Sequence, residues 1–77
     1  MENKNLTHKV IKDIIRIRKE KGISQTELSK QTGLAKSTIA RMELGEVNPT
    51  LTVLVKILDV LERDIKVVHK KKVNIDG

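Results

Sequence analysis

Aliphatic residues recur at helical spacing in two long stretches of the chain. The first stretch predicts an amphipathic helix that Thr7 caps and Gly22 ends. Its apolar stripe comprises Val10, Ile11, Ile14, Ile15 and Ile17. The second stretch follows Thr50, which we expect to be the N-cap of another helix. Its stripe comprises Leu51, Leu54, Val55, Ile57, Leu58 and Leu61.

Between these stretches, the segment SQTELSKQTGLAKSTIARMELG, residues 24–45, predicts two short helices joined by a tight turn. Ser24 and Glu27 have the spacing of a capping box, and the helix they begin ends before Gly33. The next helix covers residues 35–44. Because neither helix is long enough to be stable alone, the two outer helices must complete a common core. The inward-facing residues of the segment are Leu28, Leu34, Ile39 and Met42.

After Leu61 the helical stripe stops, and the sequence DIKVVHKKKVNI is rich in β-branched residues. This composition predicts a short strand over residues 65–69. A lone strand needs a pairing partner, which the helical remainder of the chain does not offer. A second copy of the protein is the simplest source, so Ile65, Val67 and Val68 are candidate dimerisation residues.

The length and composition fit one small domain, and the residue pattern predicts an all-α fold of four helices with this possible strand. We divide the 77 residues into a flexible leader (1–6), the helical domain (7–61) and the tail (62–77). There is no cysteine, no apolar run of the ~18 residues that span a membrane, and no signal-peptide stretch at the start. We therefore expect a soluble cytoplasmic protein with no membrane association.

The chemistry of the side chains argues against an enzyme. His8 and His69 lie far apart, the acidic residues form no paired motif, and no nucleophile–base pair is recognisable. We therefore expect no cofactor, no metal and no small-molecule ligand. The net charge of +6 fits either a solvated surface or an anionic partner such as nucleic acid, and composition alone does not decide between them.

A tight turn between two short helices makes them cross steeply, which is helix-turn-helix geometry. The outer face of the helix over residues 35–44 is then free to enter the major groove of DNA. Arg41 and Lys36 can donate to guanine O6 and N7, and Ser37 can donate or accept. Ala40 permits close approach and contact with a thymine methyl group. Ser24 and Gln25 begin the preceding helix, where backbone N–H groups can meet phosphate.

The stretch GISQTELSKQTGLAKSTIARMELGEVNPTLTVLVKIL resembles the lambda-repressor-like helix-turn-helix family, also called the Cro/repressor or xenobiotic-response-element (XRE) type. The resemblance covers residues 10–61. It implies a bundle of four or five helices whose third helix reads bases. The residues at the spacing of the family are Gln25, Glu27, Leu28, Gly33, Ile39, Glu43 and Gly45.

The resemblance also assigns roles to particular residues. The base-contacting positions of the family are matched by Lys36, Ser37 and Arg41. Gln25 and Thr38 match phosphate-contacting positions, and Thr38 can equally be an ordinary surface residue. Arg18 and Glu43 match a pair that is often salt-bridged. Ala35 replaces the usual capping Ser or Thr, and the fifth helix of the family has no clear counterpart here.

The leading hypothesis is a sequence-specific regulator of transcription that binds double-stranded DNA. As a dimeric repressor, it would read a near-palindromic operator. The alternative is an antitoxin, which binds a toxin protein and represses its own operon; the tail ERDIKVVHKKKVNIDG motivates this alternative. A third hypothesis is binding to double-stranded RNA.

Overall fold

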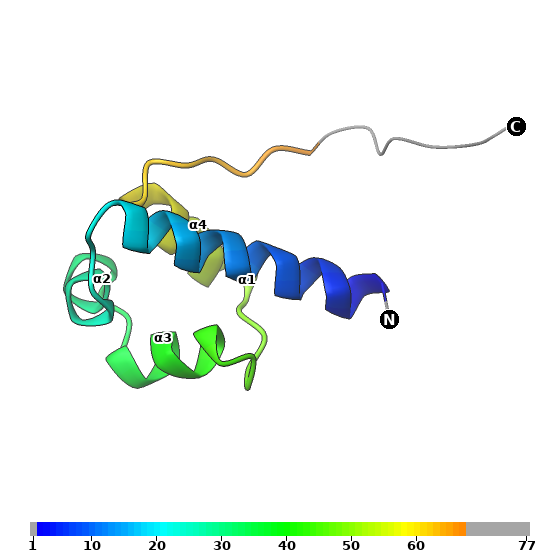
Figure 1. Cartoon of the computed structure of the whole chain (residues 1–77), viewed down its shortest axis with the longest axis horizontal. Helices are drawn as coiled ribbons and strands as arrows, with labels where there is room; N and C mark the ends of the chain where they lie inside the picture. Colours follow the sequence, from blue (N-terminus) through cyan, green and yellow to red (C-terminus); the bar gives the residue numbers. More distant parts are fainter. Residues whose placement is uncertain (1, 68–77) are drawn as a thin grey trace, which may run out of the picture.

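The computed structural model describes residues 2–67, with side chains from residue 6 onward. This part of the chain forms four helices and contains no strand (Figure 1). The helices are α1 (Glu2–Glu20), α2 (Gln25–Thr32), α3 (Lys36–Glu43) and α4 (Leu51–Val60). The prediction of an all-α bundle is therefore confirmed.

Helix α1 is longer than the sequence pattern predicts. It begins at Glu2 rather than at Thr7, so the Thr7 cap is wrong and residues 2–6 of the expected leader are helical. No glycine or proline interrupts the chain before Gly22, and threonine costs little inside a helix, so nothing local stops α1 from extending upstream. In Figure 1 its N-terminal half projects beyond the other three helices.

The starts of α2 and α4 follow the predicted caps. The Ser24 hydroxyl accepts a hydrogen bond from the Glu27 N–H at 3.0 Å, and the Thr50 hydroxyl accepts one from the Val53 N–H at 3.2 Å. The Glu27 carboxylate accepts instead from the side-chain amide of Gln31 at 2.7 Å. Only the Ser24 half of the predicted capping box is therefore formed in the described residues.

The turn between α2 and α3 is closed by hydrogen bonds on both sides of Gly33. Gly33 has φ of 79°, and its N–H donates to the Ser29 carbonyl at 2.9 Å. The Ser29 hydroxyl donates to the Leu34 carbonyl, and the Leu34 N–H donates to the Thr32 hydroxyl at 3.2 Å. Figure 1 shows α2 nearly end-on while α3 runs across the view, so the two helices cross steeply.

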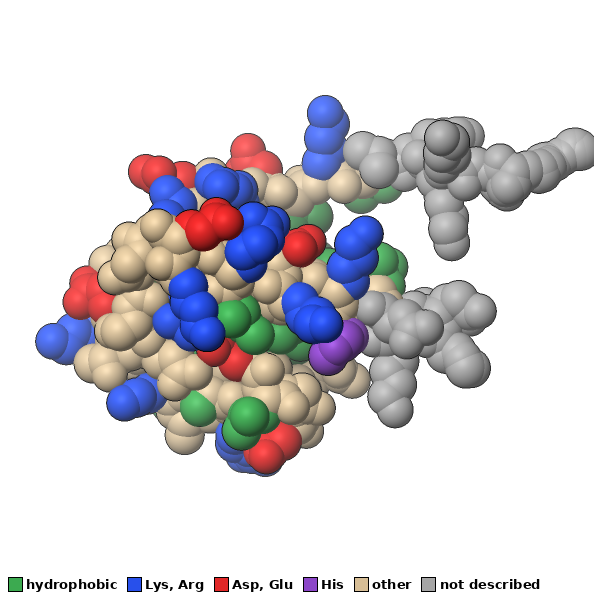
Figure 2. Space-filling model, in the orientation of Figure 1, with side chains coloured by type: hydrophobic (Ala, Val, Ile, Leu, Met, Phe, Trp, Pro, Cys, Tyr) green, Lys and Arg blue, Asp and Glu red, His purple; other side chains and the backbone are tan. Residues whose placement is uncertain are grey.

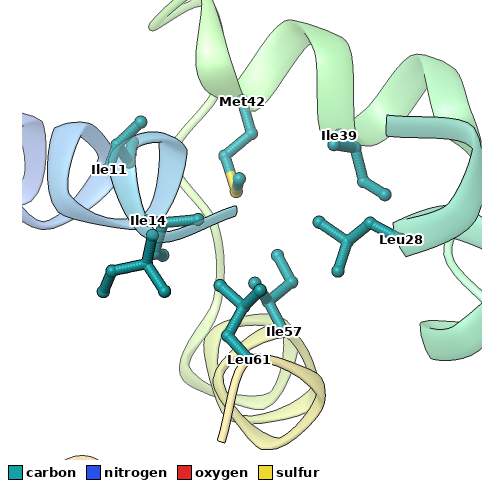
Figure 3. Close-up of a cluster of buried hydrophobic side chains, with 8 residues drawn as sticks. Ile11, Ile14, Leu28, Ile39, Met42, Ile57 and Leu61 are labelled. Atoms are coloured by element: carbon teal, nitrogen blue, oxygen red, sulfur yellow. The ribbon is translucent and has the colours of Figure 1, made fainter. Parts of the chain in front are cut away.

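All four helices contribute side chains to one aliphatic core (Figure 3). Its buried members are Ile11, Ile14, Ile17, Leu28, Ile39, Met42, Ile57 and Leu61. The inward orientation predicted for the segment between the outer helices is confirmed, with Leu34 half-buried against the core. The predicted stripe of α4 is too wide, because Leu51 and Val55 are 66% and 50% exposed.

The chain beyond α4 forms neither helix nor strand over residues 64–67. The predicted strand over residues 65–69 is therefore absent where the structure describes it, and Val68 lies outside the described residues. A strand requires a neighbouring strand to bond to, and this single helical chain supplies none. Ile65 and Val67 are left 47% and 97% exposed.

Glu62 links the end of α4 to the end of α1. It has a left-handed backbone with φ of 60°, and the neighbouring Arg63 N–H donates to the Leu58 carbonyl at 2.8 Å. Its carboxylate lies 3.0 Å from Lys21 Nζ. The hydrogen bond and the positive charge of Lys21 hold the pKa of Glu62 below its ordinary value.

This lowered pKa makes a prediction for Glu62→Gln. A carboxyl whose pKa is lower in the folded state stabilises the fold above its unfolded pKa, and this stabilisation is lost as pH falls through the folded pKa. The wild type should therefore be more stable than Glu62→Gln at neutral pH, and the two should converge in acid. Thermal unfolding followed by circular dichroism from neutral to acidic pH measures the difference. Asp64→Asn is the control, and a difference that does not change with pH would contradict the prediction.

Candidate nucleic-acid interface

Helix α3 has one anchored face and one exposed face. Ile39 and Met42 are fully enclosed in the core, so they fix the inner face. Lys36, Ser37 and Arg41 are all exposed. Ser37 and Arg41 are four positions apart, which places them on the same side of the helix. All three predicted base-contacting residues are therefore exposed on α3, and Ser37 and Arg41 share one side of the helix.

Two further predicted residues border this face: Thr38 is exposed and Ala40 is half-buried. The sequence did not point to Glu46, whose carboxylate lies 3.6 Å from Arg41 Nε. The backbone turn after α3 brings the two together, since the Glu46 N–H donates to the Arg41 carbonyl at 2.9 Å. No motif signals this contact, because it depends on how the turn folds back. It places one negative charge beside the exposed face of α3.

Behind α3, Arg18 and Glu43 form the ion pair that the resemblance implies. Arg18 Nε lies 2.8 Å from one carboxylate oxygen and Nη2 lies 2.9 Å from the other. The two side chains are only 8% and 7% exposed. Arg18 Nη1 also donates to the Ile23 carbonyl at 2.8 Å. One guanidinium thus joins the last turn of α1, the α1–α2 turn and the last residue of α3.

Gln25 completes this buried network. Its side-chain amide donates to Glu43 at 2.9 Å, which ties the first residue of α2 to the end of α3. Sequence reasoning assigned Gln25 to phosphate and did not find this bond, which crosses 18 positions and has no local signature. A side-chain amide carries two N–H donors, so one remains for a phosphate. The exposed Ser24 hydroxyl also keeps its own hydrogen to donate.

Positive charge is widespread on the surface. Figure 2 shows Lys and Arg side chains over α1, and others along the lower edge next to α3. Lys36 and Arg41 belong to α3 itself. With a net charge of +6, a polyanion such as DNA would be attracted before specific contacts form.

Within residues 2–67 the structure shows neither a metal centre nor a membrane span. No three His, Cys, Asp or Glu residues of this part lie together in a way that could hold a metal ion. Its helices include none that is long and apolar enough to cross a bilayer.

The steep helix pair with a polar outer face on its second helix defines a helix-turn-helix protein. The sequence model of the helix-turn-helix family matches residues 14–68. An uncharacterized HTH-type transcriptional regulator of Haemophilus influenzae is 39% identical over 64 residues. The alignment covers 83% of this chain but only 65% of that relative. The chain belongs to the helix-turn-helix family, as the sequence resemblance predicts.

The buried ion pair predicts a large loss of stability for Arg18→Met. Removing the guanidinium leaves Glu43 buried without its counter-charge, so we expect the free energy of unfolding to fall by about 3 kcal/mol. Arg16→Met is the matched control on the same helix, because Arg16 pairs with Glu20 at an exposed site. The control should change stability by no more than about 0.5 kcal/mol. Urea denaturation measures both variants.

The double variant Arg18→Met/Glu43→Leu separates charge burial from packing. Without either charge no uncompensated ion is buried, so the double variant should recover much of the lost stability. If the double variant is less stable than Arg18→Met alone, the loss in Arg18→Met does not come mainly from the unpaired charge of Glu43. In that case the hydrogen bonds of the ion pair themselves stabilise the fold.

The start of α3 offers a site for stabilisation. Ala35 occupies the N-cap with extended backbone angles and provides no side-chain hydrogen bond. Ala35→Ser would supply a hydroxyl acceptor to the first turn, so we expect a gain of about 1 kcal/mol. Ala35→Val, which lacks the hydroxyl and is a poor N-cap residue, is the control for added side-chain volume. Equal stability of the Ser and Val variants in urea would contradict the capping explanation.

Proposed function

We propose that this protein is a transcriptional regulator that binds double-stranded DNA with α3 in the major groove. The observation that supports this most directly is the outer face of α3. Three side chains with base-reading chemistry stand exposed there, while the inner face is held by the core and by the Arg18–Glu43 pair. A helix fixed in this way can present its side chains to base edges with one defined orientation.

Each side chain has a part in this proposal. Arg41 donates to guanine O6 and N7, and Lys36 donates to the same kind of acceptor. Ser37 donates or accepts beside them, and Ala40 contacts a thymine methyl group. The residues proposed to position the protein on phosphates are Ser24, Gln25 and Thr38. Binding should therefore weaken steeply as salt concentration rises.

The proposed active form is a dimer on a near-palindromic operator. Two copies would place two α3 helices in successive major grooves, with half-sites about 10 bp apart. Ile65, Val67 and Val68 are proposed to pair with the same residues of the second copy. Occupation of a promoter by such a dimer would exclude RNA polymerase, which makes repression the proposed outcome in the cytoplasm.

A second candidate function is that of an antitoxin. The exposed aliphatic side chains of Ile65 and Val67 support it, because exposed apolar residues after the last helix can bind another protein. An antitoxin would bind its toxin and repress its own operon. Co-expression with the product of the neighbouring gene tests this function. A stable complex and relief of toxicity would support it, and the absence of both would exclude it.

Selection from random DNA duplexes tests the proposed function. The substitution Arg41→Ala tests whether Arg41 contacts a base. Purified wild type at near-physiological salt should enrich a near-palindromic sequence. Arg41→Ala should bind that sequence more weakly by about 1–3 kcal/mol and should lose preference at one base position per half-site. Fluorescence anisotropy with duplexes substituted at each position measures both effects.

Arg16→Ala is the matched control for this experiment. The side chains of Arg16 and Arg41 are similarly exposed, 58% and 60%, and both contact carboxylates. Each substitution removes one positive charge, so only a base-reading role predicts loss of preference in Arg41→Ala alone. Equal effects of the two substitutions would contradict the role of Arg41. No enriched sequence, or equal affinity for RNA and DNA duplexes, would contradict the proposed function.

A further inference from the structure

Glu46 is an acidic residue at a place where neither the fold nor DNA binding favours one. It follows the C-terminal end of α3, where the helix dipole favours positive charge instead. Its contact with Arg41 also places it beside the helix face proposed to meet DNA, where a carboxylate would repel phosphates. A residue that breaks a local rule without an evident gain in stability points to a functional role.

The turn after α3 fixes the backbone of Glu46 against Arg41. The Glu46 N–H donates to the Arg41 carbonyl at 2.9 Å, and the Gly45 N–H donates to the Met42 carbonyl at 3.0 Å. These two hydrogen bonds form a Schellman motif, in which Gly45 supplies the left-handed residue with φ of 81°. Glu46 and Arg41 thus occupy the two positions of the motif whose side chains commonly make an apolar contact.

The pair of side chains at this end of α3 differs from the corresponding pairs elsewhere in the described chain. Helices α1 and α4 close with the same two hydrogen bonds, and the corresponding pairs are Ile23 with Arg18 and Arg63 with Leu58. Each of those pairs includes one aliphatic residue. Of these three helix ends, only that of α3 brings two opposite charges together.

The Glu46 carboxylate contacts Arg41 at one edge of the guanidinium. It lies 3.6 Å from Nε, which is the distance of an ion pair and not of a hydrogen bond. Both side chains are more than half exposed, so the pair contributes little to the stability of the fold. The two Nη groups carry four of the five N–H donors of an arginine, and they can meet guanine O6 and N7 together. The contact with Glu46 does not use these groups.

We infer that Glu46 is a positioning residue for Arg41, which raises the preference of α3 for guanine and lowers its affinity for DNA of any sequence. Its charge restrains the long Arg41 side chain on the Nε side, so the Nη groups face the bases and lose less freedom on binding. The same charge repels phosphates in every complex with DNA, which weakens binding that has no base contacts. This inference deepens the proposed function and rests on it, because it takes Arg41 as the reader of guanine.

Glu46→Gln tests the inference through opposite effects on two kinds of binding, because it keeps the shape of the side chain and removes the charge. Affinity for duplexes of unrelated sequence should rise about twofold to fivefold, the range of an exposed ion pair. Preference for guanine at the base position that Arg41→Ala identifies should fall by a similar factor. Fluorescence anisotropy with the selected duplex, its base-substituted versions and unrelated duplexes measures both effects. Urea unfolding should be unchanged.

Glu20→Gln is the matched control. Glu20 is 58% exposed and lies 3.3 Å from the equally exposed Arg16, so this substitution also removes one carboxylate from an exposed ion pair. It should leave the preference at every base position unchanged. Equal loss of guanine preference in the two variants would overturn the inference, because the change in net charge alone would then explain the loss.

The double variant Arg41→Ala/Glu46→Gln shows whether Glu46 acts through Arg41. Once the guanidinium is absent, removal of the Glu46 charge should cause no further loss of preference at any base position. A further loss would overturn the inference and make Glu46 a base reader itself, since a carboxylate can accept a hydrogen bond from cytosine N4.

Nuclear magnetic resonance of the free protein tests the restraint without DNA. Nitrogen relaxation of the Arg41 Nε–H should give a higher order parameter in the wild type than in Glu46→Gln. The Arg16 Nε–H should have the same order parameter in both proteins. Equal order parameters for Arg41 in the two proteins would overturn the restraint.

The inference and the proposed function fail in different experiments. A wild type that enriches no DNA sequence contradicts the proposed function, and the role of Glu46 in base recognition falls with it. An enriched sequence whose guanine preference is the same in the wild type and in Glu46→Gln overturns the role of Glu46 alone and leaves DNA recognition supported.

Discussion

The orientation of α3 depends on the buried contact between Arg18 and Glu43. An eight-residue helix without a side-chain cap has little stability of its own, so its position comes from its contacts. Ile39 and Met42 supply apolar burial, which holds the helix to the core without fixing a direction. The two parallel hydrogen bonds of a guanidinium and a carboxylate do have a fixed geometry. Through Gln25, the same carboxylate also sets the distance between the start of α2 and the end of α3.

The sequence predicted the features whose cause is local. Residue spacing located Leu28 and Ile39 in the core, because a helix repeats every 3.6 residues wherever it occurs. Ser24 and Thr50 marked helix starts, since a cap hydroxyl bonds to an N–H only three residues away. Gly33 marked the turn because a left-handed backbone favours glycine. Each of these signals depends on neighbours within one or two turns of the chain.

The features that the sequence did not predict depend on residues far apart. Gln25 reaches Glu43 only after α2 and α3 have folded against each other, so periodicity carries no sign of the bond. The stripe of α4 showed which residues are apolar but not which side the core would cover, and Leu51 and Val55 were wrongly included. The start of α1 at Glu2 was missed although its cause is local. The sequence marks it only by the absence of a helix-breaking residue, which is a weak signal.

The exposed side chains of α3 and α4 differ in chemistry. The outer face of α3 is polar and stable in water, whereas Leu51 and Val55 leave aliphatic side chains of α4 hydrated at a cost in free energy. Helix α2 packs against both α3 and α4, and its Leu28 lies fully buried between them. Close-packed interiors deform little, so α2 keeps α3 in a fixed position relative to α4. The core therefore fixes where α3 stands, while the proposed choice of bases depends on the exposed side chains of that helix.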